Sequence, residues 1–180
     1  GPRNDVSILW RALKHRDVLD EDIAVLTDPV LPVSADFPKP RGLPHRAEIL
    51  AELDRLAETA QKGDTVLFYY SGHGSVQPVN PDIPQEEPEA DGQDQVILPG
   101  DVGAYSMIDQ SIKNAIVDNE LAAKFDAIRA KGAFVWAVVD ACHSGTVTRG
   151  QDVTRSVDPA ALGVPAAIKL ETHGGEREAG

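Results

Sequence analysis

The sequence has a single cysteine, Cys142, among its 180 residues. An internal disulfide is therefore excluded, which favours a reducing compartment such as the cytoplasm. Long apolar runs are also missing: none approaches the ~20 residues that a membrane-spanning helix needs. The N-terminal segment GPRNDVSILW lacks the basic and then apolar pattern of a signal peptide, although the chain also lacks an initiating Met, so a signal on a longer precursor stays open.

Basic residues are few beside acidic ones. The chain has 17 Lys and Arg against 29 Asp and Glu, which gives a formal net charge of −12. Nucleic acids and anionic membranes attract basic surfaces, so neither is an expected partner, whereas cationic peptides are favoured. Apolar residues make up 42% of the chain, which is ordinary for one globular domain with its own core.

The hydrophobic pattern alternates between helix and strand, which predicts an α/β fold with a mostly parallel sheet. Asn4 or Asp5 is expected to cap a first helix, and Asp118 or Asn119 a later one. The runs at 65–70 and 133–139 are continuously apolar, which is typical of strands buried on both faces. Further elements are expected as a strand at 23–26, a helix at 46–62, an exposed loop at 75–94 and a strand at 96–98.

The two strongest strands end in short, glycine-containing loops, SGHG at 71–74 and DACHSG at 140–145. Ligands of open parallel sheets bind outside the carboxyl ends of the strands. If the strands are neighbours, His73 and Cys142 lie at the same edge of the sheet. An imidazole beside a thiol lowers the thiol pKa and later protonates a leaving amine. The backbone N–H groups of Gly74 and Cys142 are candidates to bind a developing oxyanion.

Taken one at a time, these residues have simpler interpretations. A lone cysteine is more often a small buried apolar residue than a nucleophile, and a lone histidine after a strand is more often a loop residue. A metal site made of His73, Cys142 and His143 is a further alternative. However, adjacent side chains in an extended segment point apart, and no other cysteine is available.

The segments YYSGHG (69–74) and VVDACHSG (138–145) resemble the His and Cys motifs of caspase-like peptidases, specifically of metacaspases and their prokaryotic relatives. Matches at 4–6, 91–101 and 116–121 extend the resemblance over residues 1–150. It implies the caspase–hemoglobinase fold, a three-layer α/β/α sandwich that is incomplete in this chain. It also implies a cysteine endopeptidase with His73 and Cys142 as its dyad. An inactive caspase-like scaffold that binds partner proteins is the alternative.

The resemblance further implies a pocket for the substrate residue before the cut, lined by Asp5, Ser71 and Asp140. Two carboxylates there would bind Arg or Lys and reject Asp. No cofactor is needed for this chemistry, but calcium activates many metacaspases. Asp94 and Asp118 match two acidic positions of the family's calcium site.

Two positions depart from that calcium site: Asn119 stands where an acid is common, and Arg149 adds a repelling charge where another acid is expected. The family also has a smaller C-terminal portion that nothing after Gly150 resembles. Residues 1–150 are thus expected to be the large-subunit portion, completed by a second chain or segment, with 151–180 as an inter-subunit linker or flexible tail. If the enzyme cuts after basic residues, it is expected to process itself in or just before this tail. The candidate basic residues are Arg149, Arg155, Lys169 and Arg177.

Overall fold

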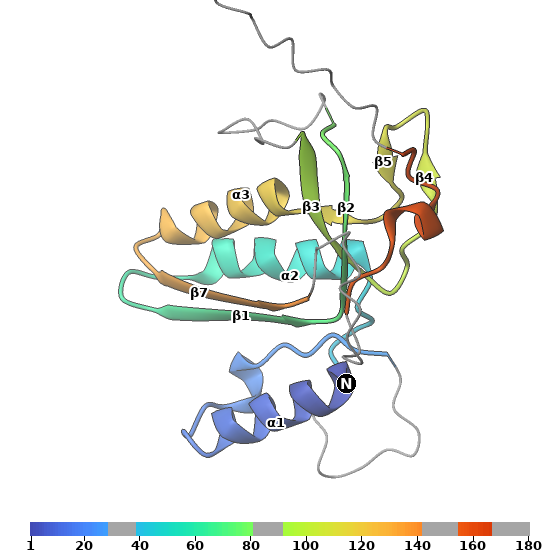
Figure 1. Ribbon diagram of the computed structural model, residues 1–180. Coiled ribbons are helices and arrows are strands. Elements are labelled where there is room, and N and C mark those ends of the chain that lie inside the picture. The colour runs from blue at the N-terminus through green and yellow to red at the C-terminus, as the bar shows by residue number, and fades with distance from the viewer. Residues whose placement is uncertain (29–38, 81–91, 142–154, 167–180) are drawn as a thin grey trace, which may run out of the picture.

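The computed structural model describes residues 1–28, 39–80, 92–141 and 155–166. Its centre is a parallel pair of strands, β1 (Thr65–Ser71) and β7 (Phe134–Asp140), which run in register from Thr65 beside Phe134 to Ser71 beside Asp140. Helices α2 (Arg46–Thr59) and α3 (Asp118–Arg129) lie side by side on one face of this pair, and α1 (Pro2–Lys14) lies on the other (Figure 1). This three-layer order is that of a caspase-like α/β/α sandwich.

The main core fills the space between the strand pair and its two helices. Helix α2 contributes Ile49 and Leu53, and helix α3 contributes Leu121, Phe125 and Ile128 at the three- and four-residue spacing of one helical face. The Phe125 ring lies 5.3 Å from that of Phe68, centroid to centroid. Because both helices bury these stripes against the same strands, the carboxyl ends of β1 and β7 are held rigidly.

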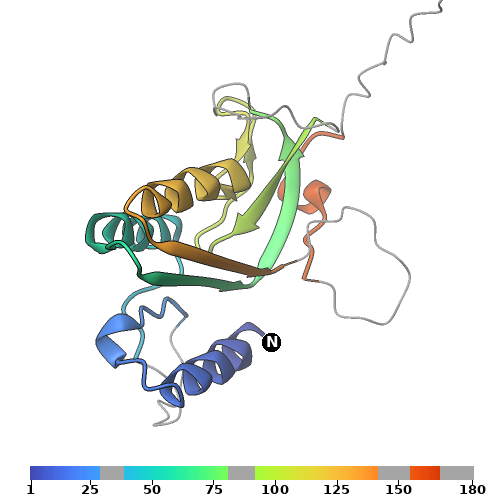
Figure 2. The same cartoon turned by 90° about the vertical axis from the view of Figure 1, so that its left-hand side faces the viewer.

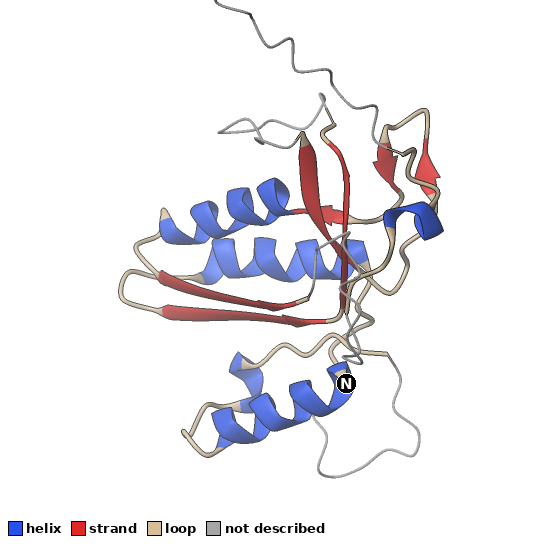
Figure 3. Cartoon of the chain, in the orientation of Figure 1, coloured by secondary structure: helices blue, strands red, loops and turns tan. Residues whose placement is uncertain are grey.

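A second, antiparallel sheet begins where β1 ends. Its order is β2 (His73–Pro78), β3 (Gln93–Leu98) and β6 (Ile116–Val117). A short antiparallel pair, β4 (Tyr105–Ser106) and β5 (Ser111–Ile112), lies beyond it, as Figure 3 shows. A separate apolar cluster around Val96, Leu98 and Ile112 packs this part of the molecule.

Several expectations about single elements are wrong. Among the described residues, the segment 23–26 has a single isolated β-bridge, between Leu26 and Gly42, and therefore forms no strand. Strand β7 is not buried on both faces: Phe134 and Trp136 are 65% and 60% exposed. Helix α3 packs on β7, whereas α1, on the opposite face of the pair, packs on β1. Residues 75–78 and 93–94 belong to β2 and β3 instead of an exposed loop.

The expected helix caps also differ. Asp5 lies in the first turn of α1, which begins at Pro2, and the expected cap by Asn4 or Asp5 is absent. Helix α3 begins at Asp118, so Asp118 and Asn119 are inside it. The Glu120 carboxylate instead accepts the N–H of Val117 at 3.2 Å, which satisfies a donor at the helix start.

Residues 155–166 are packed, within the segment 151–180 that the sequence predicts to be an inter-subunit linker or flexible tail. They include the short 3-10 helix η2 (Pro159–Leu162), and Val157, Leu162 and Val164 pack on the second apolar cluster. Figure 2 shows this segment beside β2. Within the described residues, no helix is long and apolar enough to cross a membrane.

Candidate active site

The parallel pairing of β1 with β7 brings the loop at 71–74 and the last residue of β7, Asp140, to one edge of the sheet. Ser71 and Asp140 are paired residues at the last position of the ladder, and the Gly72 N–H continues it by donating to the Asp140 carbonyl at 3.4 Å. His73 follows directly as the first residue of β2. Cys142 itself lies outside the described residues, two positions beyond Asp140 in the sequence.

Asp5, Ser71 and Asp140, the predicted pocket residues, converge on one guanidinium group, that of Arg155. Its Nη2 donates to Asp5 Oδ2 at 2.6 Å, and its Nη1 donates to Ser71 Oγ at 2.7 Å. Nη1 also forms an ion pair with the Asp140 carboxylate and donates to the Asp140 carbonyl at 3.1 Å. Ser71 Oγ in turn donates to Asp5 Oδ2 at 3.0 Å. The three predicted pocket residues thus come from α1, β1 and β7, and they surround one guanidinium group.

The charges in this pocket stabilise one another. The hydrogen bond from Arg155 is the main cause that lowers the pKa of Asp5, with a further contribution from Ser71 and against the cost of burial. The reciprocal bond to Asp5 raises the pKa of Arg155. The Asp5 and Arg155 side chains are 23% and 24% exposed, so the pair is only partly screened by water. The pocket therefore favours a fixed positive charge.

His73 and Gly74 face the main chain of the same residue. The Gly74 N–H donates to the Arg155 carbonyl oxygen at 3.0 Å, and His73 Nδ1 lies 3.3 Å from that oxygen. A hydrogen bond from Nδ1 requires a proton there, because a carbonyl oxygen only accepts. The Gly74 N–H and the solvent-exposed His73 imidazole therefore both lie at the Arg155 carbonyl oxygen.

The backbone of His73 is held by Tyr70, which sequence reasoning did not single out. The Tyr70 hydroxyl shares its one proton between the carbonyl oxygens of His73, 2.9 Å away, and Leu98, 3.0 Å away. Burial is the main cause that raises its pKa to about 12, so it stays a donor throughout the physiological range. Gly72 leaves room for the ring, because a Cβ at that position would lie 2.5 Å from the Tyr70 hydroxyl oxygen.

The predicted calcium residues do not form a metal site within the described part of the chain. That part contains no group of three or more His, Cys, Asp or Glu side chains able to hold an ion. Asp94 is fully buried, and its Oδ2 accepts the Asn80 N–H at 3.3 Å, while Asp118 Oδ1 accepts the Asn119 N–H at 2.9 Å. Among the residues that the structure describes, the two carboxylates thus bond to backbone N–H groups and do not belong to a calcium-binding cluster.

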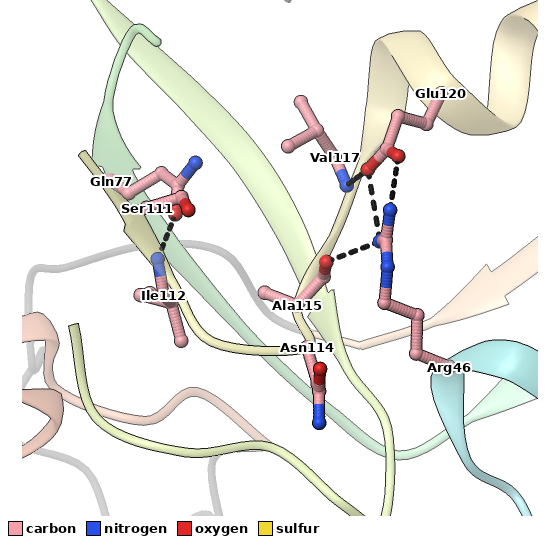
Figure 4. Close-up of a pocket in the computed structure, with 8 residues that line it drawn as sticks. All are labelled: Arg46, Gln77, Ser111, Ile112, Asn114, Ala115, Val117 and Glu120. Carbon is pink, nitrogen blue, oxygen red and sulfur yellow. Dashed lines mark hydrogen bonds and ion pairs between the residues drawn. The ribbon is translucent and has the colours of Figure 1, made fainter. Parts of the chain in front are cut away.

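A hollow elsewhere in the molecule is lined by residues of β2, β5 and β6 and by the first turns of α2 and α3 (Figure 4). Arg46 crosses it and donates to the Ala115 carbonyl at 2.6 Å, and it is also paired with Glu120. Gln77 Oε1 accepts the Ile112 N–H at 2.8 Å. These contacts join α2 to the start of α3, and the lining offers neither a thiol nor an imidazole.

Comparison with known proteins agrees with this arrangement. Residues 1–150 match the family described as metacaspase, peptidase C14 domain. Metacaspase-1 of Mycosarcoma maydis is 33% identical over 146 residues, covering 81% of this chain. Metacaspase-1 of Cryptococcus neoformans is 39% identical over 127 residues, 70% of this chain, and metacaspase-1 of Candida albicans is 31% identical over 147 residues, 82% of it.

The fold and the matched residues define a domain of the caspase-like class. This chain belongs to the metacaspase family. It spans 31%, 23% and 30% of the lengths of those three relatives, so it corresponds to a part of each of them.

Proposed function

We propose that this protein is an endopeptidase that cleaves after Arg or Lys, with Cys142 as nucleophile and His73 as acid–base partner. One observation carries the proposal: a guanidinium is held by Asp5, Ser71 and Asp140 at the sheet edge where His73 begins β2. The chain order supports the nucleophile, because Cys142 follows Asp140 by two residues.

The residues divide the reaction between them. The Cys142 thiolate attacks the carbonyl carbon of the residue bound in the pocket, and the Gly74 N–H stabilises the negative oxygen. The amine then leaves with a proton from His73, and a thioester remains. Water hydrolyses the thioester and regenerates the thiolate.

Specificity follows from the shape and charge of the pocket. The planar guanidinium group of Arg bonds both carboxylates and the Ser71 hydroxyl at once. The carboxylate of an acidic substrate residue would be repelled by Asp5 and Asp140. A Lys ammonium reaches the same carboxylates as a point charge. We therefore expect Arg to be preferred over Lys, and Asp to be rejected.

The test is a peptide-library cleavage profile of the full-length protein beside its Cys142→Ala variant. Cleavage after Arg and Lys that disappears in Cys142→Ala is the expected result. If both proteins leave the library intact while remaining folded, the chain is a scaffold and not a peptidase. Cleavage after Asp would contradict the pocket assignment alone.

We also propose that the C-terminal portion found in longer relatives completes the sheet beside β7. In the described residues β7 pairs only with β1, and it exposes Phe134 and Trp136 on one face. Trp136 fluorescence should shift to the blue when that portion is present, because its indole leaves water. An unchanged spectrum would place the portion elsewhere.

A further inference from the structure

Residues 155–157 cross the candidate site as a short segment alongside β2. Ser156 forms a parallel bridge with Gly74. The Gly74 N–H donates to the Arg155 carbonyl at 3.0 Å, and the Val157 N–H donates to the Gly74 carbonyl at 2.9 Å. The main chain is therefore hydrogen-bonded on both sides of Ser156, which fixes its register against Gly74.

In that register, Arg155 takes the place of a substrate residue in two ways, through its side chain and through its carbonyl oxygen. The Arg155 side chain occupies the pocket of Asp5, Ser71 and Asp140, while its own carbonyl oxygen sits at Gly74. An arginine paired with surface carboxylates for stability alone would not need its carbonyl at the oxyanion donor. Side chain and carbonyl together place the Arg155–Ser156 bond as the bond to be cut.

The segment that follows anchors this placement. Ser75 Oγ donates to the Val157 carbonyl at 2.9 Å, and Val157, Leu162 and Val164 pack on the second apolar cluster. Asp158 caps η2 by accepting the Ala160 N–H at 2.9 Å. Because the anchor begins two residues after Arg155, it holds this basic residue at the site.

We propose that the Arg155–Ser156 peptide bond is the self-cleavage site and that Cys142 of the same molecule cuts it. This inference rests on the proposed function. We further infer that, until the cut, the Arg155 side chain excludes other basic peptides from the pocket. A tethered side chain competes at an effective concentration of the order of millimolar, well above that of a typical external peptide.

The step consumes one water and needs no other reactant. The Cys142 sulfur forms a bond to the Arg155 carbonyl carbon, and the C–N bond to Ser156 breaks as its amine takes a proton from His73. Water then adds to the thioester carbon and the C–S bond breaks. The products are a carboxylate on Arg155, a new amino terminus on Ser156 and the restored thiolate.

The first experiment follows the full-length protein by intact-mass and N-terminal analysis. Wild type and the control Arg149→Gln should yield a new N-terminus at Ser156, at a rate that does not change on tenfold dilution. Arg155→Lys should keep the cut, because it keeps the charge. Arg155→Gln and Cys142→Ala should leave the bond intact. A rate that falls with dilution would overturn cleavage within one molecule.

A free peptide with Arg before the scissile bond separates this inference from the proposed function. If wild type cleaves that peptide but keeps its own Arg155–Ser156 bond, the self-cleavage site is wrong and the peptidase assignment stands. If folded wild type cleaves neither, both fail. Arg155→Gln should still cleave the free peptide, which shows that the variant is folded and that its loss is confined to its own bond.

The second experiment measures pocket occupancy without catalysis. A fluorescent Arg-containing peptide should bind the double variant Cys142→Ala/Arg155→Gln at least ~10-fold more tightly than it binds Cys142→Ala, because the tethered competitor is gone. Equal affinities would overturn the exclusion of other peptides by Arg155.

Discussion

Ser71 and Asp140 are paired residues at the last position of the parallel ladder between β1 and β7. Their side chains belong to the same face of the sheet, since paired residues of neighbouring strands point the same way. Both bind one guanidinium group, and Asp5 from α1 completes the set. The pocket is therefore a product of strand register: a slip of one residue would turn one side chain to the opposite face.

Removing the Asp140 carboxylate should remove cleavage after Arg. We expect Asp140→Ala to lower kcat/KM for an Arg peptide by about 10-fold or more, because a hydrogen bond to a charged group is worth about 1.5–3 kcal/mol. The side chain is 47% exposed, so the fold should survive, with an unchanged far-UV circular dichroism spectrum.

Asp126→Ala is the matched control for that change. Asp126 is a surface carboxylate that pairs with Arg129 on α3, away from the pocket. It should leave kcat/KM unchanged. Undiminished cleavage after Arg in Asp140→Ala would eliminate the role of Asp140 in substrate binding.

Tyr70 is expected to act as a positioning residue for His73. Tyr70→Phe removes the hydrogen bonds to the His73 and Leu98 carbonyls, each worth about 0.5–1.5 kcal/mol. We expect kcat to fall about 3- to 10-fold with little change in KM, because the imidazole shifts while the pocket stays in place. Steady-state kinetics beside Tyr69→Phe, which removes the neighbouring hydroxyl, will measure this. A rise in KM with constant kcat would refute the positioning role.

Gly72 should not tolerate a side chain. A Cβ there would approach Tyr70 atoms at 2.5 and 2.7 Å, so Gly72→Ala should displace the ring and destabilise the protein by about 1–3 kcal/mol. Urea unfolding in the Cys142→Ala background, which prevents proteolysis, gives the free energy. Gly42→Ala is the comparison, since its Cβ would meet only the flexible Leu26 side chain at 3.3 Å. Similar losses at both positions would show that the Tyr70 contact is not decisive.

Tyr70 should also make stability depend on alkaline pH. Burial raises its pKa from 10.0 to about 12, so the unfolded chain loses this proton more readily than the folded one. The stabilisation is fully present below pH 10.0 and is lost as the pH rises toward about 12. The free energy of unfolding of Cys142→Ala should therefore fall more steeply there than that of Cys142→Ala/Tyr70→Phe. Parallel curves would mean that Tyr70 is not protected by burial.

Much of the candidate site could be predicted from local patterns. The apolar runs at 65–70 and 133–139 predict strands because continuous β-branched and aromatic residues suit a pleated, packed surface. The loops at their ends follow from glycine and small polar residues. The family resemblance added Asp5, Ser71 and Asp140 as pocket residues. Sequence reasoning missed Tyr70, whose role depends on a hydroxyl reaching two carbonyls from different strands.

Local patterns predict the two main strands, the order of their loops and a basic residue in the tail. The tertiary contacts add that Arg155 bonds to Asp5, Ser71 and Asp140 and that its carbonyl oxygen accepts the Gly74 N–H. The physical reason is that these contacts join residues up to 150 positions apart. Such contacts depend on the pairing of β1 with β7 and on the packing of Val157 and Leu162, which no local pattern encodes.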